Sequence, residues 1–260
     1  VDALQKAGAL EHQRIATDHL TKRLFAGELR NRVTCNYCGQ HSDTFDPIED
    51  ISLSLATCTD IAQYLANFAR EEILDGDNKY FCEHCKVKQT ARKRMNIRIA
   101  PPCLVIHLKR FGEGGMLGGL CGGGRGRAKI VHRITFPPTL RLAPPVLAGA
   151  GAGGNYDLTG VLVHSGMSIH SGHYYAYVKM RDQQGQFKWY KVNDSSAEIV
   201  DQKKVLSAQA YILFYDSTPS ASGSTARQRY ARYGLIGDLA VQPFLWLMLI
   251  LVLLLLPLLL

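Results

Sequence analysis

Cysteine is scarce in this sequence, with 7 residues among 260. So low a number excludes the dense disulfide scaffold of a small secreted domain. The chain also lacks the basic-then-apolar segment that opens a secreted precursor, and its first residue is Val1. We therefore interpret it as a piece of a longer protein that folds in a reducing compartment.

Neither charged nor apolar residues are depleted overall. Hydrophobic residues make up 47% of the chain and charged residues 20%, which excludes wholesale disorder and a collagen-like fibre. Lysine and arginine number 30 against 22 acidic residues, so the formal net charge is +8. The length is that of one domain or two.

Residues 239–260 contain no charged side chain and are almost wholly apolar. A run of this length can cross a bilayer, and the preceding stretch carries arginines, as the positive-inside rule expects for an anchor that faces the cytosol. We interpret residues 217–238 as a polar, basic linker. Two interpretations of the tail stay open, a transmembrane anchor and a sequence added by a mispredicted exon or read-through.

Two glycine-rich stretches, 112–127 and 143–154, are predicted to be flexible loops, and neither has the spacing of a phosphate-binding loop. The apolar spacing predicts helices over residues 1–26 and 59–74. Runs of β-branched and aromatic residues predict strands. These runs cover 103–111, 161–164, 173–180, 187–192 and 210–215. An α+β fold follows, with an antiparallel sheet and few helices.

Four of the cysteines form two C-x-x-C pairs, Cys35 with Cys38 and Cys82 with Cys85. This spacing lets both thiolates of a pair face one ion, so it predicts a structural zinc site closed by four thiolates. His84 is the alternative ligand within the second pair. The competing interpretation is four unrelated buried or redox-active cysteines.

Basic residues near the second cysteine pair suggest a rival function, a zinc-dependent nucleic-acid-binding module. The aromatic residues, however, gather in the strands from 174 to 190 and not among these cations, so no stacking platform is visible. Solvated surface charge is the preferred interpretation, and no nucleic-acid partner is expected. The basic residues concerned are Lys86, Lys88, Arg92, Lys93 and Arg94.

Residues 173–194 are predicted to form a β-hairpin with its turn near Gln183 and Gln184. In that register, within a slip of about one residue, Asn193 lies opposite Tyr174, one position from His173. An asparagine beside an imidazole can fix its tautomer, so that the other ring nitrogen deprotonates a thiol. Asp194 supplies a second polar partner. A structural histidine at the start of a strand is the alternative.

Several segments together resemble the later part of the catalytic domain of ubiquitin-specific proteases, which are papain-like cysteine peptidases. The resemblance extends from Val1 to about Asp216, and its segments occur in the family's order. Besides the two cysteine pairs they are SDTFDPIEDISLSL (42–55), NKYFCEHC (78–85), LVIHLKRF (104–111), Lys129 to Leu140, VLVHSGMSIHSGHYYAYVK (161–179), WYKVND (189–194) and AYILFYD (210–216).

The resemblance implies thiol-dependent hydrolysis of ubiquitin from protein conjugates, with ubiquitin and ubiquitinated proteins as partners, in the cytoplasm or nucleus. It implies His173 as general base, Asn193 as its orienting partner and Asp194 as a neighbouring acidic residue. The four cysteines correspond to a structural Zn²⁺ site in the fingers, about 30–95, and residues 96–216 to the palm. The loop from Gly166 to Gly172 corresponds to one over the channel for the ubiquitin tail.

One part of the family's pattern is missing. The nucleophilic cysteine and the asparagine of the oxyanion hole lie in an N-terminal box that has no counterpart here, so a truncated thumb is expected. Cys58, Cys103 and Cys121 are the remaining cysteines, and none matches that box. We expect this chain alone to be inactive, either as part of a deubiquitinase or as a ubiquitin-binding pseudoenzyme.

Overall fold

The computed structural model describes residues 21–55, 58–111, 129–148, 154–168, 171–182 and 184–218. Within these ranges strands predominate over short helices, as the α+β expectation requires. The chain divides into two compact units, each assembled from separate stretches of sequence. Unit 1 draws on Val1–Asp50, Phe68–Leu104 and Leu142–Gly154, and unit 2 on Ile51–Asn67, Val105–Arg141 and Asn155–Leu260.

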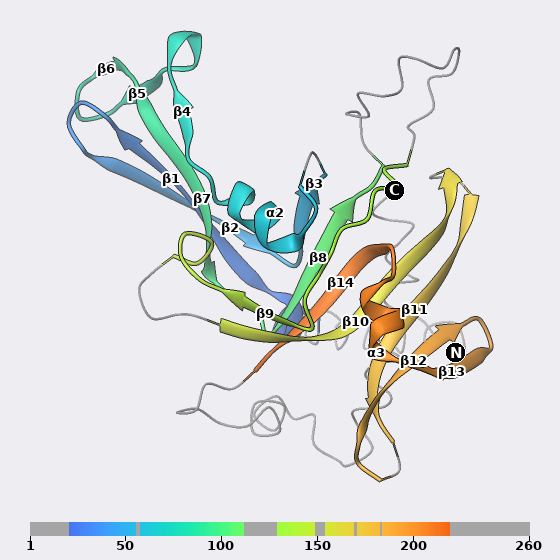
Figure 1. The fold of residues 1–260 in the computed structure, drawn as a ribbon. Coiled ribbons are helices and arrows are strands. Elements are labelled where there is room, and N and C mark those ends of the chain that lie inside the picture. Colours follow the sequence, from blue (N-terminus) through green and yellow to red (C-terminus); the bar gives the residue numbers. More distant parts are fainter. Residues whose placement is uncertain are drawn as a thin grey trace, which may run out of the picture. The chain divides into compact units, whose positions relative to one another are not determined.

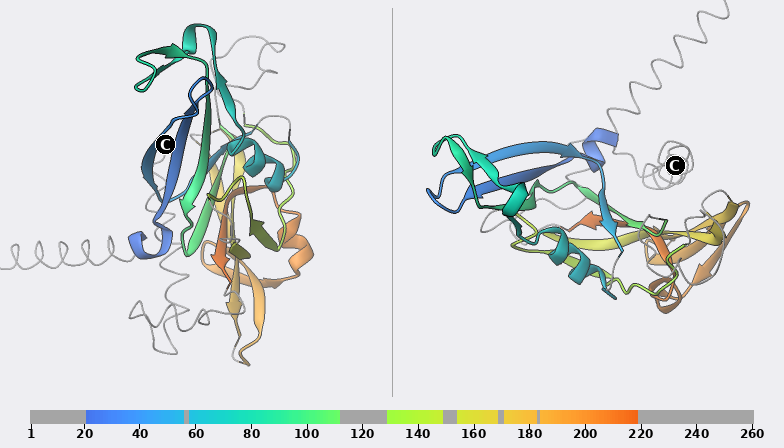
Figure 2. Two further views of the ribbon diagram at one scale, coloured as in Figure 1. Left: turned by 90° about the vertical axis from the view of Figure 1, so that its left-hand side faces the viewer. Right: turned by 90° about the horizontal axis from the view of Figure 1, so that it is seen from above.

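Unit 1 contains a four-stranded sheet in the order β2-β1-β7-β4, with antiparallel pairing throughout (Figure 1). A two-stranded hairpin, β5-β6, lies at one end of this sheet, as Figure 2 shows from two further sides. The elements are β1 (Gly27–Cys35), β2 (His41–Ile48), β4 (Glu72–Leu74), the 3-10 helix η1 (Gly76–Asn78), β5 (Tyr80–Cys82), β6 (Val87–Gln89) and β7 (Ala91–Ile99).

Polar side chains link neighbouring strands of the sheet in unit 1, and an apolar segment pairs with one of these strands. Arg32 makes two hydrogen bonds to Asp43 on the neighbouring strand, at 2.7 and 2.5 Å. Residues 143–148, predicted as part of a flexible loop, instead form a turn that pairs with β7. The Ile97 N–H donates to the Val146 carbonyl at 2.8 Å, and Ile97, Val146 and Leu147 are buried.

Unit 2 is built on one large sheet in the order β13-β12-β11-β10-β14-β8-β3, with β9 paired to β10 (Figure 1). The pairing of β3 with β8 is parallel, which departs from the expected antiparallel pattern. The elements are β3 (Ile51–Ser54), α2 (Ile61–Phe68), β8 (Cys103–Lys109), β9 (Thr139–Leu142), β10 (Gly154–Ser168), β11 (Ser171–Arg181), β12 (Phe187–Asn193), β13 (Ser196–Val200), α3 (Gln202–Leu206) and β14 (Ala210–Ser217).

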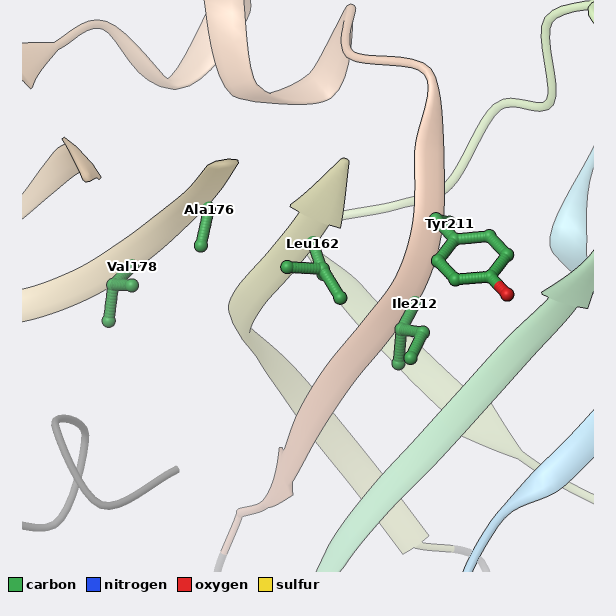
Figure 3. Close-up of a cluster of buried hydrophobic side chains, with 5 residues drawn as sticks. All are labelled: Leu162, Ala176, Val178, Tyr211 and Ile212. Carbon is green, nitrogen blue, oxygen red and sulfur yellow. The ribbon is translucent and has the colours of Figure 1, made fainter. Parts of the chain in front are cut away.

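The central strands of this sheet carry a cluster of buried apolar side chains. Leu162 of β10, Ala176 and Val178 of β11, and Tyr211 and Ile212 of β14 form it (Figure 3). Leu162 lies opposite Ala176 on one side and opposite Ile212 on the other, so these three side chains and that of Val178 share one face of the sheet. Tyr211 joins them at a shift in the β10–β14 register. Burial of this kind contributes about 25 cal/mol per Å² of apolar surface, which makes β10, β11 and β14 a firm base for polar residues at their ends.

The helix predicted over 59–74 is wrong at its C-terminal end. Helix α2 ends at Phe68, and residues 72–74 form β4, where Ile73 lies opposite Arg92 of β7. Pairing with β7 satisfies backbone groups that the predicted last helical turn would have used, so tertiary contacts override the local spacing. Of the helix predicted over 1–26, residues 21–25 are helical, and 1–20 lie outside the described residues.

Candidate functional site

The β11–β12 hairpin confirms the predicted pairing but in a register shifted by one residue. Val178 lies opposite Tyr190, whereas the predicted register would have set it opposite Trp189. The turn explains the shift, because the Asp182 carboxylate accepts the N–H groups of Gln184 at 3.0 Å and Gln186 at 2.8 Å. These hydrogen bonds from the backbone to a side chain close the turn and centre the hairpin on Gln184. Hydrophobic alternation alone does not specify where the turn is centred.

The hairpin brings His173 of β11 and Asn193 of β12 together. His173 Nε2 is hydrogen-bonded to Asn193 Oδ1. The His173 side chain is 47% exposed, so about half of it is accessible to solvent. If Nε2 carries the proton and donates it to the amide oxygen, Nδ1 holds a lone pair and can accept a proton. The pair thus has the geometry of a base with an orienting partner.

Asp194 lies at the turn that follows β12. Its Oδ2 is 3.8 Å from His173 Nε2, and its side chain is 76% exposed. The residue has a positive φ of 49°, a conformation that aspartate tolerates better than most residues. The turn is closed by pairing of Asn193 with Ser196, whose hydroxyl donates to the Asn193 carbonyl at 2.8 Å. The carboxylate therefore stands at the solvent side of the imidazole.

A second histidine, His164, packs against the residues on either side of His173. Sequence patterns do not identify this residue as part of the site. His164 is buried, and its ring lies 4.6 Å from the ring of Tyr174. A Cβ atom built on Gly172 would lie 2.0 Å from His164 Nε2, so the ring packs directly against the backbone before His173. Burial, aided by the charge of Lys129, lowers the pKa of His164 and favours its neutral form.

The four predicted metal ligands form one cluster in unit 1. The sulfur atoms of Cys35, Cys38, Cys82 and Cys85 all lie within 4.8 Å of one another, and Cys38 Sγ is 3.6 Å from Cys82 Sγ. Within the described part of the chain His84 is not a member of this group. Four sulfur donors at such separations fit a tetrahedral ion, so the cluster could hold a metal ion.

The two cysteine loops share one backbone design although they are far apart in sequence. In each loop the N–H of the fourth residue after the first cysteine donates to the carbonyl of that cysteine, Gly39 to Cys35 at 3.0 Å and Lys86 to Cys82 at 2.8 Å. Both donors have a positive φ, 73° at Gly39 and 57° at Lys86. This shared turn points both thiols of each pair the same way.

The thiols of the cluster differ in acidity. The backbone N–H of Cys85 lowers the pKa of Cys82 to about 7. Burial, together with the neighbouring thiols of Cys38 and Cys82, raises the pKa of Cys85 to about 12. A divalent cation bound by these sulfur atoms would displace their protons, because thiolates and not thiols are the ligands.

Three cysteines of the sequence are not members of the cluster. Cys58 Sγ accepts a hydrogen bond from Asn67 at 3.0 Å, just before α2. Cys103 is buried at the start of β8, and Cys121 lies outside the described residues. Among the described residues, the polar contacts of the His173 side chain are with Asn193 and Asp194.

The proposed tail anchor, residues 239–260, and the linker from 219 onward also lie outside the described residues. In the part of the chain that the structure describes, no helix combines the length and apolar character that a membrane span requires.

Comparisons with known proteins agree with this architecture. A family model described as "Ubiquitin carboxyl-terminal hydrolase" matches residues 2–215. Ubiquitin carboxyl-terminal hydrolase 25 of Arabidopsis thaliana is 44% identical over 197 residues, 75% of this chain and 28% of that protein. Human ubiquitin carboxyl-terminal hydrolase 42 is 38% identical over 220 residues, 83% of this chain and 15% of that protein. The chain thus spans well under half the length of these relatives.

Solved structures give the same likeness. A chain of the SAGA DUB module Ubp8/Sgf11/Sus1/Sgf73 bound to monoubiquitin superposes with a TM-score of 0.66 at 32% identity, covering 76% of this chain and 42% of that one. The same module bound to ubiquitin aldehyde gives a TM-score of 0.64 at 30% identity, with the same coverage. The fold is therefore the papain-like fold expected from the sequence.

Proposed function

Because the chain belongs to the ubiquitin carboxyl-terminal hydrolase family, we propose that it supplies the base and its orienting partner for thiol-dependent release of ubiquitin from protein conjugates. The observation that carries the proposal is the hydrogen bond between His173 Nε2 and Asn193 Oδ1. An imidazole held in one tautomer and open on its other side is the arrangement that activates a thiol.

The proposed chemistry assigns one task to each side chain. His173 Nδ1 takes the proton of a cysteine thiol, and the thiolate attacks the carbonyl carbon of the isopeptide bond between the ubiquitin C-terminus and a lysine. The imidazolium then gives its proton to the departing lysine nitrogen, and a thioester remains. Water, deprotonated by the same imidazole, hydrolyses the thioester and restores the thiol.

Asn193 and Asp194 act on the imidazole from its Nε2 side in this proposal. Asn193 keeps the proton on Nε2, so that Nδ1 is the basic nitrogen. Asp194 stands 3.8 Å away and is mostly exposed, so its carboxylate favours the transient imidazolium through a partly screened charge interaction. We assign Asn193 the orienting role and Asp194 the lesser one.

The nucleophile of this proposal is not one of the seven cysteines of the sequence. Four of them share the cluster of unit 1, Cys58 and Cys103 occupy the positions described above, and Cys121 belongs to the glycine-rich stretch outside the described residues and does not match the family's cysteine box. The thiol would therefore come from residues outside this sequence, and the chain alone would bind ubiquitin without cleaving it. Without a thiolate, the base and its partner supply almost none of the rate, because such groups act as a unit.

We also propose that Cys35, Cys38, Cys82 and Cys85 hold a structural Zn²⁺ ion. An ion held by four thiolates has no open position for water, so it would fasten two loops and take no part in hydrolysis. In this reading residues 30–95 form the fingers, 96–216 the palm, 217–238 a linker and 239–260 an anchor or an added sequence. Ubiquitin and ubiquitinated proteins are the proposed partners, in the cytosol or nucleus.

The test uses hydrolysis of a ubiquitin derivative with a fluorogenic C-terminal amide. The chain alone should show no turnover, and a longer chain that includes a cysteine box of the family should show it. In that longer chain His173→Ala should reduce kcat by about 10²- to 10⁴-fold. His41→Ala, an exposed histidine of unit 1, is the matched control and should leave kcat unchanged. Equal activity of the two variants would contradict the role of His173.

A further inference from the structure

Lys129 is one of the few buried charged side chains among the described residues, with 7% of its surface exposed. Its backbone pairs with Phe111 in an antiparallel bridge, and its Nζ lies 6.0 Å from the centre of the Phe111 ring. Burial lowers the pKa of Lys129, and the charge of Arg110 lowers it further. Burial of a charged ammonium group costs free energy unless the group is hydrogen-bonded, so the contacts of Lys129 Nζ are of interest.

The contacts of the ammonium are two backbone carbonyl groups of β10. Lys129 Nζ donates to the His164 carbonyl at 2.6 Å and to the Gly166 carbonyl at 2.9 Å. These carbonyls flank Ser165, which lies opposite His173 in the β10–β11 pairing. The register shifts directly afterwards, between Ser165 and Ser168. Backbone groups at such an irregularity lack the hydrogen-bond partners of a regular sheet. The Lys129 ammonium donates to two carbonyl groups at the point where the shift begins.

The second link is the His164 side chain, whose backbone carbonyl Lys129 holds. The His164 ring lies against Gly172, where a Cβ atom would come within 2.0 Å of Nε2, and 4.6 Å from the Tyr174 ring. The residues before and after His173 therefore both rest on His164. Fixing the backbone of His164 fixes the support on which this part of β11 lies.

We propose that Lys129 is a positioning residue for His173, which sets the alignment of the imidazole with Asn193 through the carbonyl groups of His164 and Gly166. The inference rests on the proposed function of His173 as a base. It concerns the orientation of the ring, not the chemistry, so it can be tested without turnover. Lysine is suited to the task because one ammonium can donate to both carbonyls at once.

The experiment measures the ring tautomer of His173 in the present chain by long-range ¹H–¹⁵N correlation of ¹⁵N-histidine-labelled protein. The chain has nine histidines, so the His173 signals are identified by their loss in His173→Gln. Asn193→Ala calibrates the change that follows loss of the orienting partner. The variants compared are Lys129→Met, which cannot donate, Lys129→Gln, which can reach one carbonyl, and Lys129→Arg, which keeps charge and donors. Lys109→Met, at an exposed lysine of β8, is the matched control.

We expect Lys129→Met to shift the His173 tautomer ratio by at least about half of the change seen with Asn193→Ala. Lys129→Gln should give a smaller shift, and Lys129→Arg and Lys109→Met should give none. An unchanged ratio in folded Lys129→Met overturns the inference, as does global unfolding of both Lys129→Met and Lys129→Gln, since either result leaves Lys129 a purely structural role. Failure of the deubiquitinase assay, by contrast, would refute the proposed function and leave this ratio as measured.

Discussion

The imidazole of His164 occupies the space in which a side chain on Gly172 would lie, because a Cβ atom built there falls 2.0 Å from His164 Nε2. The two residues belong to neighbouring antiparallel strands, β10 and β11. Glycine is thus required at position 172 by close approach, and its lack of a side chain lets β11 settle onto a buried ring. Because Gly172 directly precedes His173, this contact also helps to fix the backbone position of His173.

Gly172→Ala tests this contact directly. The added methyl group must displace a buried ring, and overpacking of this kind costs about 1–3 kcal/mol. We expect a fall in Tm of several degrees, since about 1 kcal/mol corresponds to about 2–4 °C in a chain of this size. Differential scanning calorimetry measures the change. Ser171→Ala, at the exposed neighbouring position, should leave Tm within about 1 °C. Equal Tm values for the two variants would show that the His164 ring moves aside at little cost in free energy, and would contradict the tight contact.

Metal binding is tested with Cys82→Ser and a matched control, Cys58→Ser. The purified chain should contain one zinc ion by elemental analysis, and Cys82→Ser should lose it. Zinc binding at structural sites is worth about 10–16 kcal/mol in small peptides, so the loss should unfold the region around β5 and β6. Cys58 lies outside the cluster, and its replacement should leave the zinc content unchanged. Retention of zinc by Cys82→Ser would argue against the assigned ligands.

The pair formed by Arg32 and Asp43 predicts a pH-dependent contribution to stability. The Arg32 guanidinium lowers the pKa of Asp43 below its usual value, so the folded state favours the ionised carboxyl group. This stabilisation is present above the unfolded-state pKa, near 3.9, and is lost as the pH falls through the folded-state pKa. Because both side chains are partly exposed, the pair is worth about 1 kcal/mol or less after solvent screening.

Arg32→Gln should therefore lower the free energy of unfolding at pH 6 and have little effect at pH 2.5. Urea unfolding at a series of pH values measures this difference. Lys86→Gln, which removes a largely exposed ion pair with Glu83, serves as the control and should change stability little at either pH. A difference between wild type and Arg32→Gln that grows as the pH falls would contradict the sign of the argument.

The uncharged tail predicts membrane association if it is a genuine anchor. Residues 239–260 are long enough to cross a bilayer, so the intact chain should sediment with membranes and resist extraction by alkaline carbonate. A chain that ends at residue 238 should be released. Complete extraction of the intact chain would favour the other interpretation, that the tail is an added sequence.

The cysteine pairs and the His–Asn hairpin could be predicted because each depends on local spacing. Two C-x-x-C pairs specify a ligand set, and strand alternation on either side of a glycine-containing turn specifies a hairpin. The shift by one residue could not be predicted, because it depends on the Asp182 carboxylate closing the turn. Period-two patterns fix which face a residue occupies but not where the turn is centred.

The support of the site was harder to predict. Lys129 reaches His164 only because the chain brings Lys129 back to Phe111 and beside β10, and no local pattern encodes that contact. The local spacing predicts a helix over residues 72–74 for a related reason, since their partner strand, β7, lies outside the window that helical periodicity describes. The Lys129–His164 contact and the strand at residues 72–74 both depend on residues outside the local sequence. Periodicity in a single sequence describes only near neighbours.

The discontinuity of unit 1 has a consequence for the order in which the protein is made. Cys35 and Cys38 leave the ribosome well before Cys82 and Cys85, and the intervening residues include β3 and α2, which belong to unit 2. Until the second pair has been made, the first two thiols lack the other members of the cluster, and we expect them to be open to oxidants and to chelating small molecules. The nascent chain remains vulnerable there until β7 pairs with β1 and the second pair arrives.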